Sequence, residues 1–264
     1  MLQYVDLAAL RELLRGLSFD AERCAEVVDA ALVDLNRLTG LPDRMHAWVR
    51  AGGISSGPGP FAGQRRIVLE ITESRNREGR MFYAAVVRQV DEAQSAPVVF
   101  LTMHSPTLDV PMRVEIPLRA LLQGNPPLEG RYTVYLHALL TDRGETWVYY
   151  GITRRRWSLR FHEHTRAAVA RKSQRLLART LEALIDARVA ELSGNPDDRP
   201  RLAGIVTALC STGLTQEVAL ETEQYLVDKY SLAGKHPFGL NMIPGGRAGI
   251  AHAGLFRRGT SPLA

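Results

Sequence analysis

The chain has 264 residues, of which 45% are hydrophobic and 23% are charged, a composition typical of a globular protein with one large or two small domains. No apolar run reaches the roughly 18 residues that a membrane-spanning helix needs, and the first turns already mix charges into their leucine pattern, unlike a signal sequence. We therefore expect a cytoplasmic protein with no membrane partner. Cys24 and Cys210 lie far apart, which argues against a disulfide framework and a four-ligand zinc site.

The formal net charge of +5 is unevenly distributed along the chain. Residues 131–264 contain 19 Lys and Arg against 12 Asp and Glu, whereas residues 1–130 contain 14 against 16. A basic C-terminal half is what a polyanionic partner such as a nucleic acid favours, although many basic surfaces bind nothing in particular.

Residues 1–125 are expected to form one region, with a role in target recognition or dimerisation. Leucines at helical spacing from Leu7 to Leu14, and a second apolar stripe from Val27 to Leu35, predict a helical pair. A Gly/Pro/Ser-rich loop at 51–60 follows. The sequence then predicts a small, mostly antiparallel sheet from four β-like runs, at 66–72, 81–90, 98–103 and 112–116.

A second domain is expected over 130–250, after a Pro/Gly-rich connector. Two strands, Tyr132–Leu139 and Thr146–Thr153, are predicted to form a hairpin in which Gly144 takes a positive φ. The pattern continues with a helix from about Trp157 to Leu192, a strand over 205–210, and a helix capped by Thr215 that runs to about Leu232. The predicted fold class is α+β, and residues 251–264 are expected to be a flexible tail.

Several polar residues that could carry chemistry occur along this second region. Thr133-Val134-Tyr135 and Tyr149-Tyr150-Gly151 lie on the hairpin, and Arg160 and His164 follow one helical turn apart. Glu223 falls within an otherwise apolar helical stripe, where a carboxylate is costly unless it is paired. Asn241 precedes Pro244-Gly245-Gly246.

This series resembles the GIY-YIG nuclease domain over roughly residues 131–247. Thr133 replaces the first glycine of that pattern and Tyr150 replaces the isoleucine of its second triplet, but both are framework positions. The resemblance implies a three-stranded sheet with flanking helices, and a metal-dependent endonuclease of restriction, defence or structure-specific type. It implies an active site made of Tyr135, Tyr149, Arg160, His164, Glu223 and Asn241.

In that reading Glu223 binds Mg²⁺ or Mn²⁺, Arg160 binds the scissile phosphate, and Tyr135 or His164 activates the attacking water. The DNA is expected to be double-stranded, and a homodimer is one open alternative for the assembly of the protein. Further contacts to the DNA are expected from Arg156, Arg171 and Arg175.

Each residue also has a purely structural interpretation. The tyrosines could be ordinary strand aromatics, Arg160 could lie on a solvated helix face, Glu223 could form a buried salt bridge, and Asn241 could serve only a turn. Two alternatives for the whole chain follow: an inactive nucleic-acid-binding or scaffolding protein that keeps the nuclease framework, and an unrelated enzyme built on the N-terminal sheet.

Overall fold

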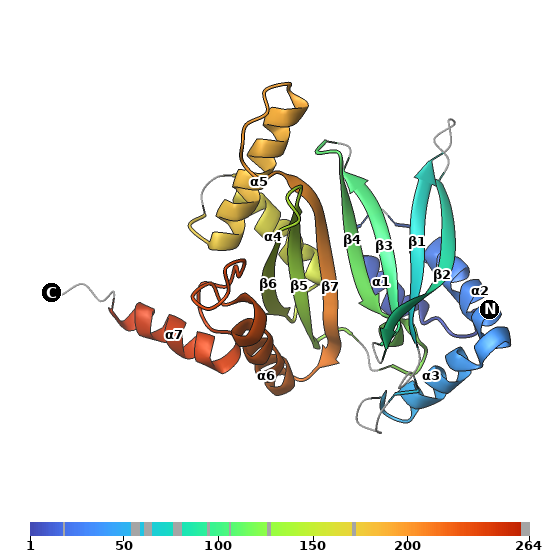
Figure 1. The fold of residues 1–264 in the computed structure, drawn as a ribbon. Coiled ribbons are helices and arrows are strands. Elements are labelled where there is room, and N and C mark those ends of the chain that lie inside the picture. The colour runs from blue at the N-terminus through green and yellow to red at the C-terminus, as the bar shows by residue number, and fades with distance from the viewer. Residues whose placement is uncertain are drawn as a thin grey trace. The chain divides into compact units, whose positions relative to one another are not determined.

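The computed structural model describes residues 1–17, 19–53, 59–60, 65–75, 81–93, 96–105, 107–125, 128–170 and 173–259. The protein is α+β, with both helices and strands in each of two compact units. The first unit comprises Met1–Met103 and Arg113–Gly130, and the second comprises His104–Met112 and Arg131–Ala264. Figure 1 traces the chain of both units from the N-terminus in blue to the C-terminus in red.

The first unit begins with three helices, where the sequence predicts two. They are α1 (Leu7–Leu14), α2 (Ala21–Thr39) and α3 (Leu41–Arg50). Asp6 and Asp20 cap the first two helices with their side chains, and α2 ends because Gly40 adopts a left-handed φ of 61°. The prediction missed α3, although its buried Leu41, Met45 and Val49 recur at helical spacing directly after this break.

The buried carboxylate of Asp29 ties the start of the chain to α2. Its oxygens accept hydrogen bonds from the backbone N–H groups of Gln3, Tyr4 and Val5, at 2.9, 2.7 and 2.9 Å. A buried acidic group is stable when backbone donors satisfy it in this way.

The strands of the first unit are in the order β2-β1-β3-β4. Their bounds are β1 Arg65–Arg75, β2 Met81–Ala93, β3 Val98–Ser105 and β4 Val110–Pro117, followed by a short 3-10 turn at Leu118–Leu121. Strand β1 pairs antiparallel with β2 but parallel with β3, so the sheet is mixed, and the prediction of mostly antiparallel pairing missed this parallel pair. The β-propensity of a run does not specify its neighbour, which explains the error.

Three strands of the second unit, in the order β7-β5-β6, form an antiparallel sheet. They are β5 (Tyr132–Thr141), β6 (Thr146–Thr153) and β7 (Leu202–Leu214). The predicted hairpin between β5 and β6 is present, and Gly144 has a φ of 79°. Antiparallel pairing brings Tyr135 opposite Gly151.

The long helix predicted from Trp157 to Leu192 is two helices, α4 (Trp157–Val169) and α5 (Leu176–Leu192). One continuous helix would be about 54 Å long, too long to keep both apolar faces on one small sheet. The break lets Ala168 of α4 and Leu177 and Leu181 of α5 share a buried cluster with Leu139 of β5.

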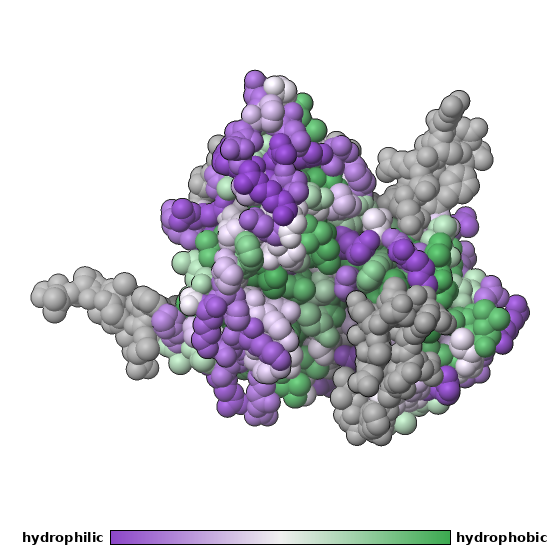
Figure 2. All heavy atoms as spheres, viewed as in Figure 1, coloured by the Kyte–Doolittle hydropathy of each residue, from purple (hydrophilic) through white to green (hydrophobic). Residues whose placement is uncertain are grey.

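The remaining helices are α6 (Gln216–Leu226), which continues into a π-helical turn at Val227–Ser231, and α7 (Gly246–Gly259). Thr215 caps α6 as predicted, with its side chain accepting from the N–H of Val218. Residues 251–259 of the predicted tail belong to α7, while residues 260–264 lie outside the described residues. Hydrophilic side chains gather over the end of α5 and the loop that leads to β7 (Figure 2, top).

Candidate active site

The hairpin of the second unit places one tyrosine phenol over a glycine. Tyr135 on β5 is fully buried, and its hydroxyl lies so close to Gly151 that a Cβ there would be 2.6 Å from the Tyr135 oxygen. The same Cβ would lie 3.1 Å from the Tyr149 ring. Glycine at this position is therefore what allows the two tyrosines to share one face of the sheet.

Helix α4 brings His164 against these tyrosines. The Tyr135 hydroxyl lies 3.3 Å from His164 Nε2, and both side chains are buried. The Tyr149 ring meets His164 edge-on, with centroids 5.2 Å apart, and lies 6.4 Å from the Tyr135 ring. Two phenols and one imidazole thus form a single contact group, as the sequence predicts.

Burial sets the protonation of this group. It raises the pKa of Tyr135 and of Tyr149 above the value of a free phenol, because the phenolate would lose its hydration. Burial and the positive charges of Arg160 and Arg175 lower the pKa of His164 to about 4. At neutral pH the phenols are therefore protonated and His164 is neutral.

Arg160 lies one turn before His164 on α4 and reaches the same group. Its side chain is 25% exposed and forms a 2.5 Å ion pair with Glu163, which also binds Arg155 at 2.9 Å. Its positive charge and hydrogen bond lower the pKa of Tyr135, against the larger effect of burial. Arg160 is thus held between Glu163 and the buried phenol, instead of lying on a solvated face.

Glu223 of α6 is half-buried at the open edge of β6. Two outward backbone N–H groups of this strand have acceptors: that of Val148 donates to the Phe238 carbonyl, and that of Tyr150 donates to Asn241 Oδ1. The N–H of Ile152 lies close enough to the Glu223 carboxylate to lower the pKa of Glu223. The negative charge of Glu223 raises the pKa of both Tyr135 and Tyr149, so the carboxylate lies close enough to act on the phenols.

Two glycines make room for Glu223. The N–H of Gly246, at the start of α7, donates to Glu223 Oε2 at 2.9 Å. A Cβ on Gly246 would lie 2.2 Å from the Leu220 carbonyl oxygen, and a Cβ on Gly245 would lie 2.7 Å from that of Glu223. Burial raises the pKa of Glu223, and the two backbone hydrogen bonds oppose that rise.

Asn241 is engaged in structural contacts. Its Oδ1 accepts from the Tyr150 N–H at 3.0 Å and from the Ser231 hydroxyl at 2.7 Å, and its Nδ2 donates to the Tyr150 carbonyl at 2.8 Å. Asn241 therefore joins β6 to the π-helical turn, which agrees with the loop-fixing alternative that the sequence leaves open.

The three arginines expected to bind DNA have different positions. Arg175 is exposed just before α5, and its charge lowers the pKa of both Tyr149 and His164, so it lies beside the tyrosine group. Arg156 is half-buried at the start of α4. Arg171 lies outside the described residues.

Sequence reasoning missed His137, a fourth member of the buried group. It lies two residues after Tyr135, on the same face of β5, with ring centroids 4.7 Å from Tyr135 and 5.6 Å from His164. Its Nδ1 contacts Thr207 Oγ1 at 3.0 Å, while Nε2 is buried without a partner in the described part of the chain. The two-residue alternation along β5 is the signal that could have identified it.

The donor set suits a metal ion that needs few protein ligands. Glu223 has no ion pair among the residues that the structure describes, and its carboxylate oxygens keep lone pairs for a cation beyond those that face the backbone N–H groups of Gly246 and Ile152. Mg²⁺ often takes one or two carboxylates and fills the rest of its shell with water and substrate phosphate. Within the described ranges no three His, Cys, Asp or Glu side chains form a metal-binding group.

The described part of the chain contains no helix with the length and hydropathy needed to cross a bilayer. No family model, curated protein or solved structure matches the chain.

Proposed function

We propose that the protein is a metal-dependent endonuclease that hydrolyses phosphodiester bonds in DNA, by chemistry like that of the GIY-YIG nucleases. One observation carries the proposal. A buried tyrosine–histidine pair, an arginine and a half-buried carboxylate, from three separate segments of the second unit, act on one another electrostatically. These are the groups that water activation, phosphate binding and cation binding require.

Tyr135 and His164 activate the attacking water as a pair. With Nε2 unprotonated, His164 accepts the Tyr135 phenol proton across their 3.3 Å contact while the phenol oxygen accepts a proton from water. The resulting hydroxide forms the new bond to phosphorus, and the bond from phosphorus to the leaving oxygen breaks. Because burial raises the pKa of Tyr135, moving both protons together is more favourable than first forming a free phenolate.

Arg160 binds a phosphate oxygen and stabilises the charge that grows during the attack. Glu163 keeps the guanidinium beside Tyr135, and because Arg155 also binds Glu163, that carboxylate stays compensated when Arg160 turns toward a phosphate. Glu223 is the protein ligand for Mg²⁺ or Mn²⁺, which when bound neutralises phosphate charge. Asn241 acts only by positioning β6.

The test compares Glu223→Gln with Glu221→Gln, an exposed carboxylate on the same helix. Purified variants are incubated with supercoiled, linear and single-stranded DNA, with Mg²⁺ or Mn²⁺ and with a chelator. We expect the wild type and Glu221→Gln to cleave only with metal, and Glu223→Gln to bind DNA without cleaving it. Turnover by Glu223→Gln would remove this carboxylate from the reaction, and an inactive wild type would refute the endonuclease.

The alternative function is nucleic-acid binding without catalysis. It is favoured because Asn241 and one oxygen of Glu223 already form hydrogen bonds within the protein, which gives both residues a role in stability. In the same assay it predicts binding by all three proteins and products from none.

A further inference from the structure

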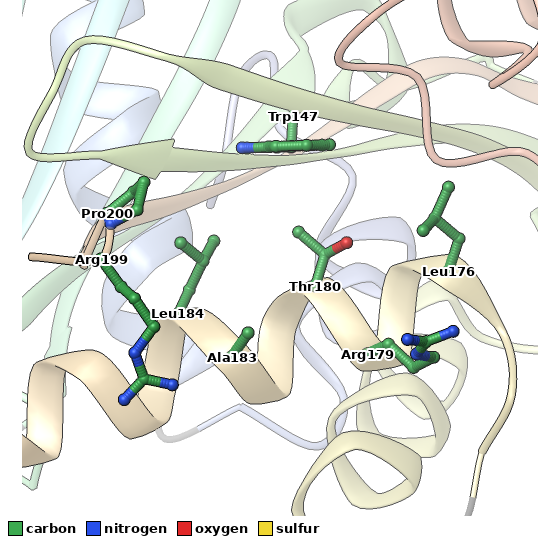
Figure 3. A pocket seen from close by; sticks show the side chains of 8 residues that line it. All are labelled: Trp147, Leu176, Arg179, Thr180, Ala183, Leu184, Arg199 and Pro200. Atoms are coloured by element: carbon green, nitrogen blue, oxygen red, sulfur yellow. The ribbon is translucent and has the colours of Figure 1, made fainter.

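A pocket of about 360 Å³ lies between β6 and α5 in the second unit, within the range of roughly 300–1,000 Å³ usual for small-molecule sites. Its upper wall is the flat ring of Trp147, and its floor is the row Leu176, Thr180 and Leu184 of α5 (Figure 3). Phe238 packs edge-on against Trp147, with centroids 5.2 Å apart, and holds the indole in place. The pocket is therefore an apolar slot with one planar aromatic wall.

Two elements lead from the tyrosine group to this pocket. Trp147 and Tyr149 lie on the same face of β6, two residues and thus about 7 Å apart. Arg175, just before α5, acts on Tyr149 and His164, and Arg179, one turn further along on α5, lines the pocket. Trp147 is thus the neighbour of Tyr149 on the face of β6 that carries the tyrosine group.

Cations lie at both ends of the slot. Arg179 is exposed at one end, and Arg199 at the other, where Asp197 accepts from its Nε at 2.8 Å (Figure 3). Thr180 adds a hydroxyl to the floor. An aromatic wall combined with cations that can follow a phosphate backbone is the arrangement by which proteins bind unpaired bases.

We propose that this slot binds an unpaired nucleobase of the DNA strand that lies across the tyrosine group. The base stacks on the Trp147 ring, and Arg179 binds the neighbouring phosphate. This inference rests on the proposed function, because it takes the strand from the phosphodiester site, but base binding can be measured without cleavage.

The experiment uses the full chain and two fluorescein-labelled probes in the presence of EDTA: a thymidine 12-mer, and a 12-mer of abasic deoxyribose phosphate with the same backbone charge. Anisotropy titrations compare the wild type with Trp147→Ala, Trp147→Phe and Arg179→Gln. Arg166→Gln, an exposed arginine on α4, is the matched control. The abasic probe removes stacking and keeps the phosphates.

We expect Trp147→Ala to weaken thymidine binding about 5- to 150-fold, the range of one lost base stack, and to leave abasic binding unchanged. Trp147→Phe should restore most of the affinity. Arg179→Gln should weaken both probes and lower the salt dependence by about one phosphate contact, whereas Arg166→Gln should change neither.

The base-binding slot would be overturned if Trp147→Ala lost the same affinity for both probes, because Trp147 would then have a general structural role. It would also be overturned if Trp147→Ala lost affinity for neither probe. The two proposals fail separately. If the protein cleaves DNA with metal but Trp147→Ala changes the affinity for the two probes equally, only the slot is refuted. If Trp147→Ala weakens thymidine binding alone but the wild type does not cleave, only the nuclease is refuted.

Discussion

The neutral state of buried His164 predicts a defined loss of stability in acid. Its folded pKa of about 4 lies below the 6.5 of a free imidazole because the side chain is 6% exposed and faces Arg160 and Arg175. Above pH 6.5 the imidazole is neutral in both the folded and the unfolded chain. Between pH 6.5 and 4 the unfolded chain binds a proton that the folded protein excludes. The free energy of unfolding therefore decreases as the pH is lowered.

The difference between the ordinary pKa of 6.5 and the folded pKa of about 4 corresponds to about 3 kcal/mol of unfolding free energy, at about 1.36 kcal/mol for each unit of pKa. Urea unfolding measures the free energy of unfolding of the wild type and of His164→Gln at pH 7 and at pH 4, and the contribution of His164 is the difference between the two proteins. The wild type should lose about 3 kcal/mol more unfolding free energy than His164→Gln over this interval. His162→Gln, which removes an exposed histidine from the same helix, should behave like the wild type.

A His164→Gln protein with the same acid sensitivity as the wild type would refute the assignment of a buried, neutral imidazole. The same conclusion would follow if nuclear magnetic resonance showed His164 titrating near pH 6.5. Either result would also weaken the proposed proton transfer, which needs an unprotonated Nε2 at neutral pH.

Two further predictions concern the framework of the site. Gly151→Ala should displace the Tyr135 phenol, cost about 1–3 kcal/mol in urea unfolding and reduce cleavage; unchanged turnover would show that the 2.6 Å approach is not needed. Asn241→Ala should leave three polar groups unpaired and cost about 3 kcal/mol, while the folded fraction keeps its dependence on metal concentration. A large change in that dependence would instead assign Asn241 to substrate or metal binding.

Local features of the second unit were predictable from short stretches of sequence. The β5–β6 hairpin follows from β-branched and aromatic residues around a glycine turn, and Thr215 caps α6 because its hydroxyl satisfies an unpaired helix N–H. The proximity of Arg160 and His164 is likewise a matter of one helical turn. These predictions succeed because the interactions act over a few residues.

Other features required the folded chain. The parallel pairing of β1 with β3 and the separation of α4 from α5 depend on which apolar faces can be buried together, and no single segment contains that information. His137 enters the tyrosine group only because α4 covers this face of β5 and β7 pairs beside it.

The order of the amino acids specifies which chemical groups are present in this protein and where along the chain they occur. The states of these groups arise from the folded chain: burial keeps Tyr135 protonated and His164 neutral, and the close approach at Gly246 gives Glu223 a backbone donor. The physical reason is that a pKa depends on the solvent and charges that surround a group, and these surroundings come from segments distant along the chain.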